Sequence, residues 1–174
     1  MKTATEILSL EHENILKFID ALLKKCEVME KKKEIDSDFF EKAIDFIRNY
    51  ADKFHHAKEE DILFKELCKD TVEMHCNPVE QMLYEHDLGR NFVKGIEEGL
   101  KKNDMGKIIK NSKGYADLLR EHIYKEDNIL YPMAEQSLGK AIKTKMLKEF
   151  ERIEKSKNKD KALAFLKSLK DGKF

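Results

Sequence analysis

Histidine and glutamate recur in this chain with a spacing that suits metal binding. The sequence HHAKEEDILF at residues 55–64 reappears without a gap as HIYKEDNILY at residues 122–131. Each copy holds a histidine and a glutamate four residues apart, so on a helix both side chains point to the same side, one turn from each other. Imidazole and carboxylate ligands without a thiolate suit iron or manganese, and they also hold zinc. The predicted ligating pairs are His55 with Glu59 and His122 with Glu126.

A lone histidine precedes each of these pairs. His12 lies in the sequence LEHEN and His86 in YEHDL, so one histidine followed by a His-x3-Glu pair occurs twice along the chain. Burying four histidines and two carboxylates without a ligand would cost several kcal/mol. The pattern therefore predicts a two-metal site between four helices, with His12 and His86 as its remaining ligands.

Four long segments must position these residues. Apolar side chains recur at helical spacing over about residues 5–30, 37–62, 79–100 and 104–133. Four helices of about 25–30 residues with short loops favour an up-down-up-down bundle, in which facing helices build metal sites from inward side chains. His12 and His86 lie early in helices one and three, and His55 and His122 lie late in helices two and four. Because direction alternates, all four histidines are expected at the same end of the bundle.

The composition supports an almost wholly helical protein. The 174 residues include two Pro, seven Gly and no Trp, set against many Lys, Glu, Leu and Ile. Ser37 is expected to cap the second helix, and Asn103 or Asp104 to open the fourth. We therefore predict an all-α fold: residues 1–138 form the up-down-up-down four-helix bundle, and residues 139–174 a short helical C-terminal extension. This lysine-rich extension either packs against the bundle or offers a surface to a protein partner.

Charge and hydropathy exclude two classes of partner. The chain has 34 basic and 34 acidic residues, and this balance gives no support for nucleic-acid binding, which needs a basic surplus. No apolar run approaches the roughly 20 residues of a membrane span, and none at the N-terminus resembles a signal peptide. The cysteines Cys26, Cys68 and Cys76 are an odd number without a CxxC motif. Free thiols in a reducing cytoplasm are the expected state.

The second helix offers two overlapping pairs, His55/Glu59 and His56/Glu60. The repeat favours the first pair, because it aligns with the ligating pair of the fourth helix. The apolar stripe agrees, since His55 continues apolar positions and His56 continues polar ones. We therefore predict His55 and Glu59 as ligands, and His56 and Glu60 as a solvated or outer pair. His75, beside a loop, is expected to be a surface histidine.

The pattern resembles the hemerythrin-like, or HHE cation-binding, family over about residues 5–136. The matching motifs are HxxKEExxLF in the second helix and HxxKEDxxLYP in the fourth. The resemblance implies a non-haem di-iron centre with the ligands His12, His55, Glu59, His86, His122 and Glu126. Oxygen-carrying hemerythrins have a further histidine four residues after the ligand of the third helix, and here that position is Arg90. The chain therefore looks more like the four-histidine branch of the family, which includes iron-centre repair proteins.

Arg90 is a poor ligand, so it is expected either to pair with a carboxylate or to stabilise an anion near the metals. If two iron ions each take about six ligands, the four histidines, two bridging carboxylates and a bridging oxo or hydroxo group leave about one open position per metal. Tyr115 lies two turns before His122 on the same face. It is expected either to hydrogen-bond a bound oxygen species or to fill the core.

The lead hypothesis for function is a di-iron protein that binds or reacts with dioxygen, nitric oxide or peroxide. The alternative is a sensor, iron store or iron donor without turnover, for which the C-terminal segment would be the surface for a protein partner. A helical scaffold without metal is a third class. The sequence alone does not decide between an enzyme and a binding module.

Overall fold

The computed structural model describes residues 2–69, 72, 78–154 and 157–170. Every regular element in this part of the chain is a helix, and no strand occurs among these residues. The all-α class predicted from the sequence is therefore confirmed. His75 and Cys76 lie outside the described residues.

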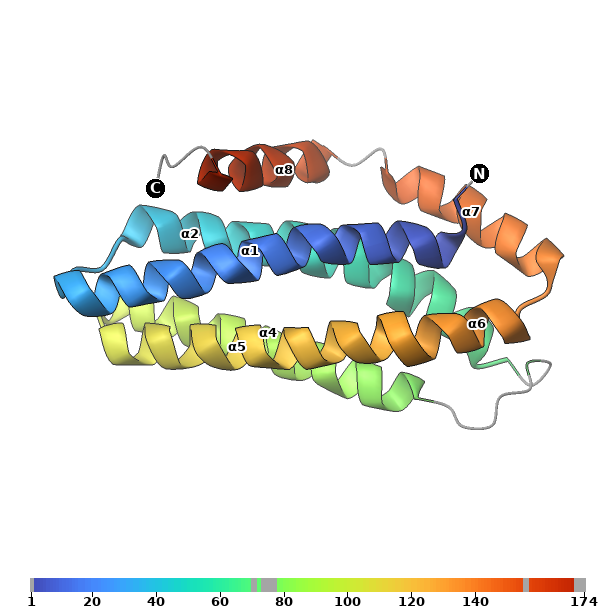
Figure 1. Cartoon of the computed structure of the whole chain (residues 1–174), viewed down its shortest axis with the longest axis horizontal. Helices are drawn as coiled ribbons and strands as arrows, with labels where there is room; N and C mark the ends of the chain where they lie inside the picture. The colour runs from blue at the N-terminus through green and yellow to red at the C-terminus, as the bar shows by residue number, and fades with distance from the viewer. Residues whose placement is uncertain (1, 70–71, 73–77, 155–156, 171–174) are drawn as a thin grey trace.

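Four helical rods carry the expected ligands, and Figure 1 shows them lying lengthwise beside one another. Rod one is α1 (Ala4–Lys32), and rod three is α4 (Val79–Lys101). Rod two joins α2 (Ser37–Phe46), η1 (Ile47–His56), η2 (Glu59–Leu63) and α3 (Phe64–Leu67). Rod four joins α5 (Met105–Lys125), η3 (Glu126–Leu130) and α6 (Tyr131–Ser137). Rod four packs on rods one and three, and α2 of rod two packs on α4.

Side-chain caps set where the rods begin. Thr3 and Glu6 form a capping box at the start of α1, in which each side chain accepts a hydrogen bond from the backbone N–H of the other residue. Asp36 caps α2 by accepting from a backbone N–H of the first turn, so the prediction of Ser37 as the cap is wrong by one residue. Asp and Ser are comparably good caps, and the sequence pattern does not separate them here. Asp104 caps α5, as one of the two predicted alternatives has it.

Rods two and four change from α-helical to π-helical turns close to the expected ligands. η1 ends at His56, and η2 and η3 begin at Glu59 and Glu126, which are equivalent positions of the internal repeat. At the end of η1 the N–H of Ala57 bonds to the carbonyl of Asp52, five residues back. Because a π turn closes over one more residue than an α turn, the side chains that follow it point in other directions than an α-helix would give. A strict 3.6-residue period therefore misplaces residues in this part of rod two.

The buried histidines and glutamates of the four rods form a polar layer, which lies between two apolar clusters. On α1, Leu8 belongs to one cluster and Ile15 to the other, and His12 lies between them. On α4, Met82 and Val93 stand on either side of the layer in the same way. Because hydrocarbon encloses the layer on both sides, its charges must be compensated by one another or by a bound ion.

The C-terminal segment forms two helices that pack on the rods (Figure 1). α7 (Lys140–Glu154) contacts α1 and η2, and α8 (Lys157–Lys170) contacts η1, α1 and α2. Their buried apolar side chains include Met146, Phe150, Ala162 and Leu166. The segment thus packs against the rest of the chain, which is the first of the two alternatives predicted for it. No helix among the described residues has the length and hydropathy needed to cross a membrane.

Candidate metal centre

The six predicted ligands come together in the polar layer, and all six are buried. Their donor atoms fall into two groups, and within each group the atoms lie within 4.8 Å of one another. The first group consists of His12, His55, Glu59 and Glu126. The second consists of His86, His122 and a residue that was not predicted as a ligand, His56. Each of the two groups has donor atoms that could hold a metal ion.

Glu59 and Glu126 lie between the two groups. Oε1 of Glu59 is 3.6 Å from Nε2 of His55, and Oε2 of Glu59 is 3.5 Å from Nε2 of His86. Glu126 reaches the remaining two predicted histidines, since its Oε2 lies 3.3 Å from Nε2 of His12 and 3.2 Å from Nε2 of His122. Each carboxylate therefore touches one histidine of each group, which is the placement that a bridging ligand needs.

Three oxygens of these two carboxylates are buried without a hydrogen-bond partner among the described residues: Oε2 of Glu59 and both oxygens of Glu126. Burial and the facing charge of Glu126 raise the pKa of Glu59 well above its ordinary value. Burial acts the same way on Glu126, but the neighbouring His122 and His12 outweigh it and hold the pKa of Glu126 well below the ordinary value. The two carboxyl groups therefore do not ionise together. A divalent cation would satisfy the oxygens and remove this repulsion, so the residues present fit a metal centre.

Each of the four predicted histidines contacts, through Nδ1, a carboxylate of another rod. The four contacts are Glu11 to His55 at 2.9 Å, Glu60 to His86 at 2.6 Å, Glu85 to His122 at 2.8 Å and Asp127 to His12 at 3.0 Å. They run in a closed ring from rod one to two, two to three, three to four, and four to one. A hydrogen bond donated from Nδ1 leaves Nε2 as the atom with a free lone pair, directed to the centre.

Two lysines hold two of these outer carboxylates. Lys58 donates to Glu11 and Lys125 donates to Glu85, and the two lysines occupy equivalent positions of the repeat. Lys58 is fully buried and also donates to Glu154 of α7 at 2.6 Å. Lys58 thus connects the C-terminal helix α7 to Glu11, the outer carboxylate that holds His55. Lys125, the equivalent lysine of rod four, is about one-third exposed.

Arg90 also binds the outer carboxylates. Its Nη2 atom donates to Glu60 at 2.7 Å and to Asp52 at 2.7 Å, and its Nη1 atom donates to Asp87 at 2.9 Å. The prediction that Arg90 pairs with a carboxylate is confirmed. With both terminal nitrogens engaged, the guanidinium supports the outer partner of His86 and does not take the place of a histidine ligand.

A comparison with models of known protein families matches the hemerythrin HHE cation-binding domain over residues 3–134. The chain belongs to this family. The matched region covers well over half of the chain and contains all six predicted ligands, so the resemblance read from the motifs is confirmed and the chain holds a cation-binding domain. The corresponding searches of curated proteins and of solved structures gave no match.

His56 departs furthest from the expectations for this HHE domain. The prediction that it is solvated is wrong, because the π-helical turns of η1 bring it inward and leave it only 6 % exposed. Its ring stacks on His86, with centroids 3.8 Å apart and planes 11° from parallel. Burial and the neighbouring His86 hold the pKa of His56 well below its ordinary value, so the imidazole is neutral. Its companion Glu60 is an outer residue, as predicted.

A different aromatic ring stacks on a histidine in each of the two groups of the HHE centre. Tyr131 stacks on His12 with centroids 5.6 Å apart, and its hydroxyl donates to Oε1 of Glu59. Phe64, the equivalent residue of the repeat, stacks on His86 at 5.9 Å and offers no hydroxyl. Tyr131 was not predicted as a residue of the site, although the aligned repeat places it opposite Phe64.

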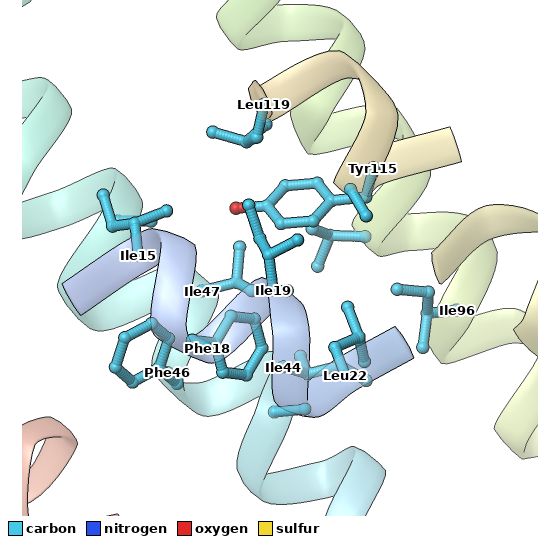
Figure 2. Packing of buried hydrophobic residues seen from close by; sticks show 14 of the residues in the cluster. Ile15, Phe18, Ile19, Leu22, Ile44, Phe46, Ile47, Ile96, Tyr115 and Leu119 are labelled. Carbon is cyan, nitrogen blue, oxygen red and sulfur yellow. The ribbon is translucent and has the colours of Figure 1, made fainter. Parts of the chain in front are cut away.

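A cavity of about 230 Å³ adjoins the second group. His56, His86 and His122 line it, together with Arg90 and Tyr115, and no member of the first group is among its described lining residues. The Tyr115 hydroxyl is buried and has no hydrogen-bond partner among the described residues. Figure 2 shows the Tyr115 ring among apolar side chains, among them Ile15, Ile19 and Leu119. Tyr115 thus fills the core with its ring and also lines the cavity beside the second group.

Proposed function

We propose that this HHE domain holds two iron ions, one at each group, and that the pair binds or reacts with dioxygen, nitric oxide or peroxide. The observation that carries the proposal is the position of Glu59 and Glu126, each within 3.6 Å of a histidine from both groups. In the proposed arrangement the four rods form an up-down-up-down bundle, and Glu59 and Glu126 bridge the ions. Nitrogen and oxygen donors without a thiolate suit iron at such a centre.

The chemistry that an iron pair supplies is the binding and reduction of small oxygen and nitrogen species at an open coordination position. The chain's own residues favour such a position at the second group. Tyr131 closes the first group with its ring and its hydroxyl, whereas the cavity reaches His86 and His122. Its volume of about 230 Å³ admits a diatomic or a peroxide, and its lining combines apolar residues such as Val93 and Leu119 with charged ones such as Arg90.

The outer carboxylates support this function by fixing the histidines before iron arrives. Each accepts a hydrogen bond from Nδ1, which prevents the imidazole from presenting the wrong nitrogen. Lys58, Arg90 and Lys125 hold three of these carboxylates, and the fourth, Asp127, accepts a hydrogen bond from the Ser9 hydroxyl. Such outer partners raise the basicity and the order of the ligands, and their loss typically costs about 10–100-fold in metal affinity.

The test loads the purified chain with ferrous iron under nitrogen and measures iron per chain by elemental analysis. Optical spectra are then recorded before and after air, nitric oxide or hydrogen peroxide is added. The proposal expects two iron ions per chain and a spectral change with at least one of the three. The double variant Glu59→Gln, Glu126→Gln is the control and should bind little iron. One ion or none in the folded wild-type protein contradicts the iron pair. Two ions without any reaction favour the alternative, an iron sensor, store or donor.

A further inference from the structure

Among the histidines that the structure describes, His56 is the one that is buried in the polar layer without a role in the predicted centre. It lies with His86 and His122 in the second group, where the three donor atoms are within 4.8 Å of one another. The Nδ1 atom of His56 is buried without a hydrogen-bond partner, and the nearest carboxylate oxygen, Oδ1 of Asp52, is 3.6 Å away. The four histidines among the predicted ligands, in contrast, are all held at Nδ1 within 3.0 Å of a carboxylate. A buried imidazole without such a bond lacks compensation for its lost hydration.

The second group also has room for another ligand. The helical position one turn after His86 holds Arg90, which is engaged with Asp52, Glu60 and Asp87. Among the described residues, therefore, rod three supplies one imidazole and rod four supplies one. His56 approaches the same place from rod two, because the π-helical turns of η1 bring both His55 and His56 inward. Two successive residues of one helix thus face the two different groups.

We infer that His56 is the third imidazole ligand of the second metal position. The inference rests on the proposed iron pair and extends it, since it gives the two ions different surroundings. The first ion has two histidines, and the second has three, so His56 takes the open position beside the cavity and must leave it before a small molecule binds there. The three imidazoles come from three different rods, so the second ion ties rods two, three and four together. The first metal position also differs from the second in its aromatic neighbour, because the hydroxyl of Tyr131 donates to Glu59 there.

Ligation requires His56 to tilt out of its stack on His86. Two parallel rings cannot both keep one ion in their planes, and these two planes are 11° from parallel. The cavity on the side of the second group offers space for this movement, since His56 lines it. The competing explanation is that His56 serves only as a flat ring stacked on His86. The two explanations differ in what a phenylalanine at position 56 would do.

The experiment compares the iron-loaded wild-type chain with the variants His56→Phe and His56→Ala. Phenylalanine keeps a flat ring for stacking but has no donor atom, whereas alanine removes both. Three readouts are used: iron per chain, the affinity for the second iron measured with a competing chelator, and the hyperfine-shifted imidazole N–H signals of ¹⁵N-histidine-labelled ferrous protein. Each ligated histidine that retains its ring N–H should give one such signal.

We expect five shifted imidazole signals in the wild-type protein, from the four predicted histidines and His56, and four in His56→Phe. Both variants should weaken the second iron by at least the roughly tenfold that loss of an outer partner costs. Added imidazole should partly restore the second iron in His56→Ala, because the cavity leads to the vacated place. Four signals in the wild type, or wild-type iron affinity in His56→Phe, would overturn the inference while leaving the iron pair intact. A wild-type chain without two iron ions would instead overturn the proposed function itself.

Discussion

Oε1 of Glu60 lies 2.6 Å from Nδ1 of His86, and this contact is one link of a closed ring. In the ring, each rod supplies one histidine to the centre and one carboxylate that holds a histidine of another rod. Loss of one carboxylate therefore loosens a ligand on a different helix. The ring couples the assembly of the four rods to the order of the ligands, because neither is complete without the other.

Glu60→Gln should weaken iron binding by about 10–100-fold, because an amide is a weaker acceptor for the Nδ1 proton of His86 than a carboxylate. The effect should fall on the second iron, since His86 belongs to the second group. Asp61→Asn is the matched control, because Asp61 is the next residue and contacts only the exposed Lys65 among the described residues. A chelator-competition titration measures both. Equal affinities in the two variants would show that Glu60 does not position His86.

Lys58→Met should destabilise the iron-loaded protein by about 3–5 kcal/mol, because it leaves buried Glu11 without its cation. Lys125→Met provides an internal comparison, since Lys125 binds Glu85 from the equivalent position of the repeat but is 34 % exposed. It should cost clearly less, because water reaches its site. Urea-induced unfolding of both variants measures the difference. A loss of the same size in both would mean that burial under α7 adds nothing to the Lys58 contact.

Much of the centre follows from the repeat and from helical periodicity. Those two features place His55 and Glu59 one turn apart on a helix, and they predict the same height for the lone histidines. The sequence also shows the carboxylates of the ring beside the predicted ligands. Glu11 precedes His12 and Glu85 precedes His86, while Glu60 and Asp127 follow the two glutamates that are predicted as ligands. Which histidine each one holds depends on packing between rods, and no pattern within a single helix specifies that.

A regular α-helical period applied to the sequence does not predict that His56 is buried. The prediction assigns it to the polar side because an α turn separates neighbouring residues by about 100°. Ten residues of π-helical turns, from Ile47 to His56, change that direction. Such turns are rare and frequently occur at functional sites, and a helical period gives no sign of them.

Iron binding should strengthen as the pH rises. Burial alone would lower the pKa of His12, but Asp127 and Glu126 outweigh it and raise the pKa to about 9. Burial is likewise outweighed at His122, where Glu126 and Glu85 raise the pKa to about 10. At pH 7 both imidazoles are therefore protonated before metal binds, and a metal must displace those protons. Each displaced proton makes the affinity rise by about tenfold per pH unit until the pH reaches the raised pKa.

The stability of the chain without metal should change in the opposite direction. A raised histidine pKa stabilises the folded chain in full below the unfolded value of 6.5, and the contribution is lost as the pH rises through about 9 and 10. Chelator competition between pH 6 and 9 measures the affinity, and thermal unfolding of chelator-treated protein measures the stability. An affinity that is independent of pH would contradict the raised pKa values of His12 and His122.

Arg90 leads to a prediction about oxygen. The guanidinium is engaged with Asp52 and Glu60, so position 90 provides no ligand, and His56 must leave its stack on His86 before it can protect the ferrous pair. Air should therefore oxidise the ferrous protein, and removal of the gas should not restore the original spectrum. Repeated cycles of air and vacuum, followed by optical absorption, provide the test. Full recovery over several cycles would favour a reversible oxygen carrier.

Tyr131→Phe should leave the stacking on His12 in place and remove the hydrogen bond to Oε1 of Glu59. Burial and the charges of Glu126 and Glu59 raise the pKa of Tyr131 well above its ordinary value, so the hydroxyl keeps its proton and remains a donor at neutral pH. Loss of this donor leaves a buried acceptor unsatisfied and should cost about 1–3 kcal/mol. Because phenylalanine stands at the equivalent position 64, the variant makes the two copies of the repeat alike.

The control for this variant is Tyr124→Phe, which removes a hydroxyl from the same rod at a residue that is 65 % exposed. Urea-induced unfolding should separate the two, with little change for the control. Iron release to a chelator should also become faster in Tyr131→Phe. The faster phase should account for one of the two ions, because the hydroxyl contacts His12 and Oε1 of Glu59, both in the first group. Equal acceleration for both ions would mean that the hydroxyl acts through the bridging carboxylate on the whole centre rather than by closing one side of it.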